Sequence, residues 1–430
     1  MSKFQIIFIA IFIVCIIAGV ALFATYKGEN NSDTLPAITV WGTFPQSVIS
    51  NLVTRINNTR PTSITVDYVE KTEANFNKDF IEALARGEGP DAILLPQDML
   101  TRHEDKIIAI PYEALSERDF KNTYIPQAEL YLTPAGSLAI PFSVDPLVMF
   151  WNRDLFTNAG IATYPVFWDE FGNLTKKIDV KDVNSNIRRS AIALGEFVNV
   201  NNAREILGAL LMQAGNPVTR KIENRLISTL GSGDFNGTNS STEAISFFTQ
   251  FSDPRHPQYS WNRSLPNSKS WFLSGNLATY FGFSSELFDI REKNPNIDFD
   301  VAPLPQPRNG KVKTTYGMMY GFSIIKNTKD AALTYTVLSI LASPTSLSML
   351  NEISYLPPVR RDMIAQGSKD PYQTIFYNSA LISHDWLDMD IAKTRAIFKK
   401  MIESVTSGRE PIYSAIERAQ EEMNFSIQNP

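Results

Sequence analysis

The chain has 430 residues, of which 43% are hydrophobic and 20% charged, and a formal net charge of −5. This length exceeds the roughly 250–300 residues at which single cores stop growing, so we expect two lobes or domains. The hydrophobic fraction excludes a mostly disordered chain, and the acidic balance argues against nucleic acid as the main partner. A single cysteine, Cys15, excludes an intrachain disulfide framework, and with only three scattered histidines we expect no metal site.

The chain opens with an uncharged apolar segment from Phe4 to Tyr26. At about 1.5 Å per residue, a helix over this segment would reach about 34 Å, enough to cross a hydrocarbon core. We therefore expect residues 1–26 to be a transmembrane anchor in the cell membrane, with the soluble body outside the cytoplasm. Two alternatives stay open: a cleaved signal, with Gly19-Val20-Ala21 as the cleavage site, and a lipid anchor on Cys15. Residues 27–34 are polar and predict a short tether.

The soluble body begins with alternating strand and helix patterns, which indicate an α/β fold. β-Branched or fully apolar runs predict strands, and apolar residues at helical spacing predict helices. No glycine-rich phosphate-binding turn interrupts the alternation. The predicted elements are, in chain order, a strand at Ile38–Trp41, a helix from Val48 to Asn57, a strand at Ile64–Val69, a helix from Phe76 to Ala85, a strand at Ala92–Leu95, and two final helices from Ile391 to Val405 and from Pro411 to Met423.

Several segments stand in the order and register of a known family. They are Ile38–Gly42, Gly89–Ala92 before Gln97-Asp98, Ile140–Asp145, Met149–Phe156, Phe167–Phe171, Ser274–Ala278, Val301–Pro305 and Leu356–Arg360. Together they make the chain resemble the extracellular solute-binding proteins that serve ABC importers, within the carbohydrate-binding branch that is similar to maltose-binding protein. The resemblance runs from Ile38 to about Asn424.

The resemblance implies a two-lobed periplasmic-binding-protein-like α/β fold of type II, with the ligand cleft between the lobes. Lobe one is expected to combine residues 35–142 with 279–321, and lobe two residues 143–278 with 322–430. The implied function is capture of a sugar or oligosaccharide by hinge closure and its delivery to ABC permease subunits in the membrane. The protein is expected to be a monomer without a cofactor.

A sugar offers hydroxyl groups to carboxylates and amides and apolar faces to aromatic rings. The resemblance places Asp145, and Asp98 with Gln97, where relatives contact sugar hydroxyls. Phe283 and Ser284 follow Gly282, where many relatives carry a stacking tryptophan that this chain lacks. The other candidates for the cleft are aromatic or lie beside glycines: Trp41, Phe44, Trp271, Tyr316, Met318, Tyr320 and Tyr413. For Trp41, Phe44 and Trp271, a position in the hydrophobic core is the alternative.

Rival functions keep the same fold but change its use. The solute could be a polyamine, a metal chelate or a peptide-like molecule, or the protein could sense a solute without transport. Few acidic residues cluster in the predicted cleft loops, which argues against a cationic ligand. Motifs of hydrolases, zinc proteases and P-loop enzymes do not occur, and the carboxylate pair Asp388 and Asp390 is expected on a solvated surface. We therefore expect a binding protein and no enzyme.

Overall fold

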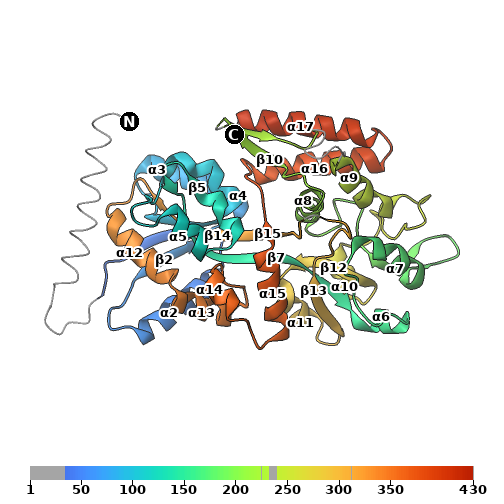
Figure 1. The fold of residues 1–430 in the computed structure, drawn as a ribbon, viewed down its shortest axis with the longest axis horizontal. Helices are drawn as coiled ribbons and strands as arrows, with labels where there is room; N and C mark the ends of the chain where they lie inside the picture. Colours follow the sequence, from blue (N-terminus) through green and yellow to red (C-terminus); the bar gives the residue numbers. More distant parts are fainter. Residues whose placement is uncertain (1–33, 224, 232–239, 311, 430) are drawn as a thin grey trace.

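The computed structural model describes residues 34–223, 225–231, 240–310 and 312–429 (Figure 1). The predicted membrane anchor, residues 1–26, lies outside these residues, as does the predicted tether apart from Thr34. Within the described ranges, no single helix has the length and apolarity to cross a membrane. A bent pair, α12 (Ala331–Leu341) with α13 (Pro344–Ser354), meets that criterion by length and composition alone.

The first five predicted elements are confirmed. Strands β1 (Ile38–Gly42), β2 (Val66–Glu70) and β3 (Ala92–Pro96) run parallel, with β1 in the middle. Helices α2 (Gln46–Thr59) and α3 (Glu73–Arg86) connect them. All five residues of β3 are buried, as expected of an apolar strand inside a parallel sheet. The carboxyl ends of these strands therefore meet at one edge of the sheet, and Gln97 directly follows β3 there.

One long strand joins the two halves of the molecule. Strand β7 (Ile140–Asn152) has 13 residues, all buried. Its first half pairs antiparallel with β14 (Thr315–Ile325), and its second half pairs antiparallel with β12 (Leu277–Phe283) and β13 (Phe299–Pro303). The sheet order is β2-β1-β3-β14-β7-β12-β9-β8, so β14 and β7 stand at its centre. Figure 1 shows β7 passing between the two lobes.

The first half of the chain contains further helices and short strands, which follow β3 in the sequence. They are α4 (Gln97–Leu100), η1 (Thr101–Lys106), β4 (Ile107–Ile108), α5 (Glu117–Thr123), η2 (Pro126–Tyr131), β5 (Leu132–Thr133), β6 (Gly136–Ser137), α6 (Arg153–Asn158), η3 (Trp168–Glu170), α7 (Phe171–Ile178), β8 (Val180–Lys181), β9 (Ile187–Ile192) and α8 (Ala203–Gln213).

The second half ends in helices, and the two predicted last helices are confirmed as α16 and α17. The other elements are β10 (Thr219–Ile222), β11 (Arg225–Ser228), α9 (Ser240–Thr249), η4 (Gln250–Ser252), α10 (Ser268–Leu273), α11 (Glu286–Lys293), α14 (Arg361–Ala365), α15 (Pro371–Leu381), β15 (Ser383–His384), α16 (Ile391–Thr406) and α17 (Ile412–Gln428).

Two hydrophobic cores divide the chain differently from the expected lobes. One core takes β7 up to Val144 and resumes at Met319, continuing through α12 and α13 to Ile364. The other starts at Leu147 and includes β12, α11 and β13. The structure therefore places residues 279–304 with the second core and residues 322–364 with the first, the reverse of the expected assignment. The reason is strand pairing: β12 and β13 bond to the second half of β7, whereas β14 leads back beside β3.

Candidate functional site

A buried arginine joins the two lobes where α4 meets α8. Arg204, the second residue of α8, has a side chain only 1% exposed. Its Nη2 donates to Asp388 Oδ2 at 2.8 Å and to Asp98 Oδ2 at 3.4 Å. Asp98 belongs to α4, just beyond the carboxyl end of β3, so this ion pair crosses from lobe one to lobe two. The arginine guanidinium also lies 4.4 Å from the ring centroid of Trp386, a cation–π contact.

Polar side chains extend this ion pair into what we call the junction network, which comprises Gln97, Asp98, Arg204, Tyr316, Asp385 and Asp388. Asp385 Oδ2 accepts hydrogen bonds from Gln97 Nε2 at 2.6 Å and from the Tyr316 hydroxyl at 3.2 Å. Arg204 Nη1 donates to the same hydroxyl at 3.2 Å. Three predicted site residues, Gln97, Asp98 and Tyr316, therefore meet in one network.

Carboxylates outnumber cations in the junction network, and all of these groups are buried. Both conditions change the pKa values of Asp98, Asp385 and Arg204. Burial raises the pKa of Asp98 to about 7, against the opposing pull of Arg204. Burial, and then the charge of Asp98, hold the pKa of Asp385 well above its usual range. Burial works against the charge of Arg204, but Tyr316, Asp388 and the other acidic neighbours raise its pKa well above the usual value. The arginine therefore stays charged, while burial, and after it the neighbouring carboxylates, favour the uptake of a proton by Asp98 near neutral pH.

Asp145 lies in β7, on the segment that joins the lobes, and is buried. Its Oδ1 accepts hydrogen bonds from Ser284 Oγ at 2.7 Å and from the Ser285 backbone N–H at 3.1 Å. Burial raises the pKa of Asp145 to about 6, although both serine hydrogen bonds favour the ionised form. Two more predicted residues, Asp145 and Ser284, are thus in direct contact. The aspartate fixes the turn between β12 and α11.

A cavity of about 600 Å³ lies beside the junction network, and we call it the α8–α16 cavity. Its walls come from the loop before α8, the first turn of α8, the end of β12, strand β14 and one face of α16. Two predicted site residues, Phe283 and Met318, line it. The lining residues are Phe197, Val198, Val200, Asn202, Ala203, Arg204, Glu205, Phe283, Met318, Ala392, Arg395, Ala396 and Lys399.

Three predicted aromatic residues near β1 pack into lobe one. Phe44 is 2% exposed, and its ring centroid lies 4.9 Å from that of Tyr320. Trp41 is half-buried against the same core, and Lys71 Nζ lies 4.4 Å from its ring centroid. Phe44 therefore takes the core position that was its alternative, Trp41 packs against the edge of that core, and Tyr320 packs beside Phe44.

The structure places two further candidates away from the junction. Trp271 lies in α10, before Leu277, at the end of β12 opposite Phe283. Tyr413 begins α17 and is 59% exposed. Helix α17 runs antiparallel to α16, as the bond from Lys393 Nζ to the Asn429 carbonyl shows. The first turn of α16 adjoins the junction, and Tyr413 lies beside the other end of that helix. Because α16 has 16 residues, Tyr413 is about 24 Å from the junction.

Sequence reasoning missed half of the junction network. Asp388 is 3% exposed, so the expectation that it lies on a solvated surface is wrong. Four carboxylates nevertheless gather at the lobe junction around Arg204 and Gln97: those of Asp98, Glu205, Asp385 and Asp388. Arg204 did carry a signal: an arginine in the first turn of a mostly apolar helix needs a partner when it is buried. Nothing local pointed to Asp385.

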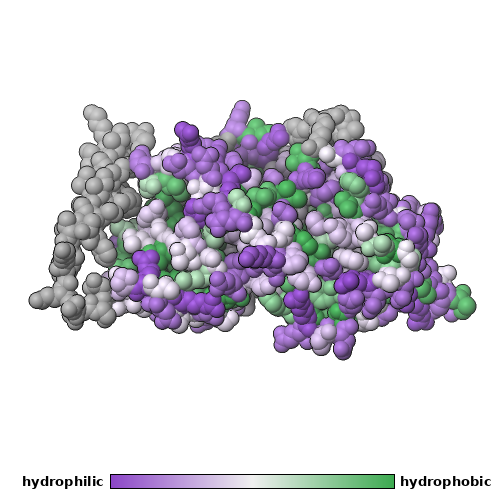
Figure 2. All heavy atoms as spheres, turned by 60° about the horizontal axis from the view of Figure 1, so that its bottom comes forward, coloured by the Kyte–Doolittle hydropathy of each residue, from purple (hydrophilic) through white to green (hydrophobic). Residues whose placement is uncertain are grey.

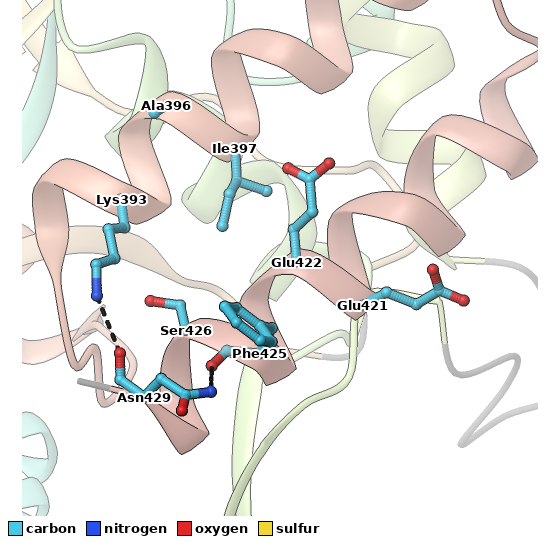
Figure 3. Close-up of a pocket in the computed structure, with 8 residues that line it drawn as sticks. All are labelled: Lys393, Ala396, Ile397, Glu421, Glu422, Phe425, Ser426 and Asn429. Atoms are coloured by element: carbon cyan, nitrogen blue, oxygen red, sulfur yellow. Dashed lines mark hydrogen bonds between the residues drawn. The ribbon is translucent and has the colours of Figure 1, made fainter.

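A second cavity lies on the outer face of lobe two and contains none of the predicted site residues. Figure 3 shows this groove of about 590 Å³ between α16 and α17, with Phe425 and Ile397 facing into it. Phe425 is 70% exposed. On the face drawn in Figure 2, hydrophobic residues lie scattered among hydrophilic ones. Among the described residues, no group of three or more His, Cys, Asp or Glu side chains is arranged to hold a metal ion.

Comparison with known proteins identifies the same fold. The solved structures of a cyclo/maltodextrin-binding protein complexed with maltotetraose and of the cyclic alpha-maltosyl-1,6-maltose binding protein from Arthrobacter globiformis are each 16% identical to this chain. Their TM-scores are 0.73 and 0.74. The first comparison covers 94% of this chain and 99% of the other, and the second covers 92% and 100%. At this identity the likeness concerns the fold.

Curated relatives and a family model extend this result. Binding proteins of Brucella abortus (strain 2308) and Brucella suis biovar 1 (strain 1330) are 21% identical over 266 residues, which is 60% of this chain. The chain matches 59% of the length of these relatives. The family model for bacterial extracellular solute-binding proteins matches residues 48–346, more than half of the chain. With two α/β lobes joined through a shared strand, the chain belongs to the family of bacterial extracellular solute-binding proteins.

Proposed function

We propose that this protein is the extracytoplasmic solute-binding subunit of an ABC importer and that its solute is a saccharide. The observation that carries the proposal is the α8–α16 cavity beside the lobe junction, in a chain of this family. Solved structures with the same fold include one complexed with maltotetraose and one with mannotriose bound. Those saccharides are ligands of those proteins. They make saccharides the first class of solute to test with this chain.

The chemistry of the cavity suits a sugar. Its volume of about 600 Å³ falls in the range of roughly 300–1,000 Å³ that is usual for ligand pockets. Phe283 offers an aromatic ring to the apolar face of a pyranose, and Asn202 and Glu205 offer polar groups to hydroxyls. The carboxylate of Asp145 is held next to this wall through Ser284, the residue after Phe283. Asp145 is therefore our candidate for a direct hydrogen bond to a sugar hydroxyl.

Lobe closure would link binding to transport. The lobes share β7 and β14, and they touch through the junction network and through Arg102, whose Nη1 lies 3.1 Å from Asp390 Oδ2. A solute that binds better between closed lobes shifts the population towards the closed form. Permease subunits that dock only this closed form would then receive loaded protein. The same lobes could serve a sensor, and a permease gene encoded beside this one would favour transport.

Thermal unfolding of the full-length protein tests the saccharide proposal. The panel contains neutral and acidic mono- and oligosaccharides, polyamines and amino acids. A ligand at 100 times its dissociation constant stabilises the fold by about 2.7 kcal/mol, which raises the unfolding temperature by a few degrees. We expect a rise with a saccharide group. A rise with polyamines or amino acids and none with any saccharide would contradict the proposed solute.

A further inference from the structure

The ionisable groups that line the α8–α16 cavity are mostly cationic. Arg204, Arg395 and Lys399 carry three positive charges, and Glu205 carries one negative charge. The aspartates of the junction network, Asp98, Asp385 and Asp388, are not among the residues that line this cavity. Because Asp98 and Asp388 compensate the charge of Arg204, the cationic character of the cavity wall comes from Arg395 and Lys399, although the whole chain carries −5.

The two outer cations stand on one face of α16. Ala392, Arg395, Ala396 and Lys399 follow helical spacing, so Arg395 and Lys399 are one turn apart. Arg395 is 53% exposed, and its Nη2 lies 3.7 Å from Glu205 Oε1, which Arg204 shares at 3.3 Å. Lys399 is exposed and forms no ion pair with any residue in the described ranges. Arg204 has two further carboxylate partners, Asp98 and Asp388, so Glu205 remains the carboxylate nearest Arg395. The charge of Lys399 has no carboxylate partner within the described ranges.

The first turn of α8 adds further donors to the same wall. Asn202 precedes the helix, and its side chain does not cap it. Its Nδ2 instead donates to the Phe281 carbonyl and to Glu286 Oε1, both at 3.2 Å, so the donors left for a ligand are those of the backbone. The backbone N–H groups of Ala203, Arg204 and Glu205 have no intrahelical partner at this position, and the helix dipole favours an anion there. The buried Nε of Arg204 also has no hydrogen-bond partner among the described residues.

We infer that the α8–α16 cavity binds an acidic saccharide, with the carboxylate of a hexuronic acid placed between the start of α8 and the Arg395–Lys399 face of α16. Arginine binds a carboxylate through two parallel hydrogen bonds, and a lysine adds a point charge. The apolar side chains of Val200, Phe283 and Met318 face the sugar ring. This inference rests on the proposed saccharide function and narrows it from any sugar to an anionic one.

Isothermal titration calorimetry on the full-length protein compares matched ligands. The pairs are α-1,4-digalacturonate against α-1,4-digalactose, and cellobiouronic acid against cellobiose, with spermidine and a sulfated disaccharide as further probes. We expect at least one acidic sugar to bind tenfold or more tightly than its neutral partner, and this preference to shrink as salt is raised. Tighter binding of the sulfated disaccharide than of either uronate would overturn the assignment to a carboxylate.

Two exposed substitutions locate the effect. Lys399→Gln and Arg395→Gln should each weaken acidic-sugar binding about tenfold and leave neutral-sugar binding unchanged. Lys400→Gln is the matched control, because Lys400 is the next residue of α16 but pairs with Glu422 outside this cavity. Equal binding of acidic and neutral sugars would overturn this inference and leave the saccharide proposal standing. Binding of spermidine alone would overturn both.

Discussion

Replacing Arg204 tests whether the junction network holds the lobes together. Arg204→Met keeps most of the side-chain volume but leaves Asp98 and Asp388 buried without their cation. The hydrogen bond to Asp388 at 2.8 Å is charge-assisted and worth about 1.5–3 kcal/mol, and the 3.4 Å contact to Asp98 is weaker. Removing one partner of a buried ion pair costs roughly 3–5 kcal/mol, because the other charge remains without compensation. We therefore expect a loss of about 3–5 kcal/mol in the free energy of unfolding.

The assay is urea unfolding at pH 7, followed by tryptophan fluorescence. Arg308→Gln is the matched control, because Arg308 lies 2.8 Å from Asp169 but is 51% exposed, whereas Arg204 is 1% exposed. Solvent screens the exposed pair, so the control should unfold close to the wild-type midpoint. If Arg204→Met unfolds at the same urea concentration as Arg308→Gln, the network does not stabilise the fold and the reasoning is refuted.

Three further predictions concern the junction, Asp145 and the two candidates that lie away from the junction. In the folded protein the pKa of Asp98 is about 7, above the ordinary 3.8, so between these values the folded state binds a proton that the unfolded state does not. The contribution of Asp98 to the free energy of unfolding therefore falls as the pH rises from about 4 to 7. Asp98→Asn should flatten that fall in urea titrations, and an unchanged slope would contradict the burial argument. Asp145→Asn keeps an acceptor for Ser284 but loses the charge, so saccharide affinity should drop about 10- to 100-fold in calorimetry with the fold intact; unchanged affinity would remove Asp145 from the site. Trp271→Phe and Tyr413→Ala should leave saccharide affinity within twofold, because both lie away from the junction.

Elements whose local pattern is complete could be predicted from the sequence. Ile38–Trp41 and Ala92–Leu95 were predicted as strands, and the structure extends each by one residue, to Gly42 and Pro96. The helix predicted from Ile391 to Val405 ends at Thr406. A buried strand appears as an unbroken apolar run, and an amphipathic helix repeats its apolar residues every three or four positions. Neither signal needs information from elsewhere in the chain. The segments that resemble the family gave the order in which these elements follow one another.

The division into lobes depended on strand pairing that no local pattern encodes. Both β12 and β14 are apolar, buried strands beside β7, yet they bond to opposite halves of it. Which half each strand takes decides where the following 20–40 residues pack, so α12 and α13 return to lobe one. This choice depends on register between segments more than 100 residues apart, which the composition of either segment does not reveal.

By itself, the sequence determined the α/β class and the family resemblance, and it marked Asp98, Asp145 and Phe283 as site candidates. Only the tertiary structure decided that Arg204 reaches Asp98 across 106 residues and Asp388 across 184. A carboxylate in a polar loop has the same local pattern whether it is solvated or buried, and Asp388 was expected in solvent for that reason. Its burial depends on the free-energy balance between desolvation and a partner charge, and that partner comes from another part of the fold.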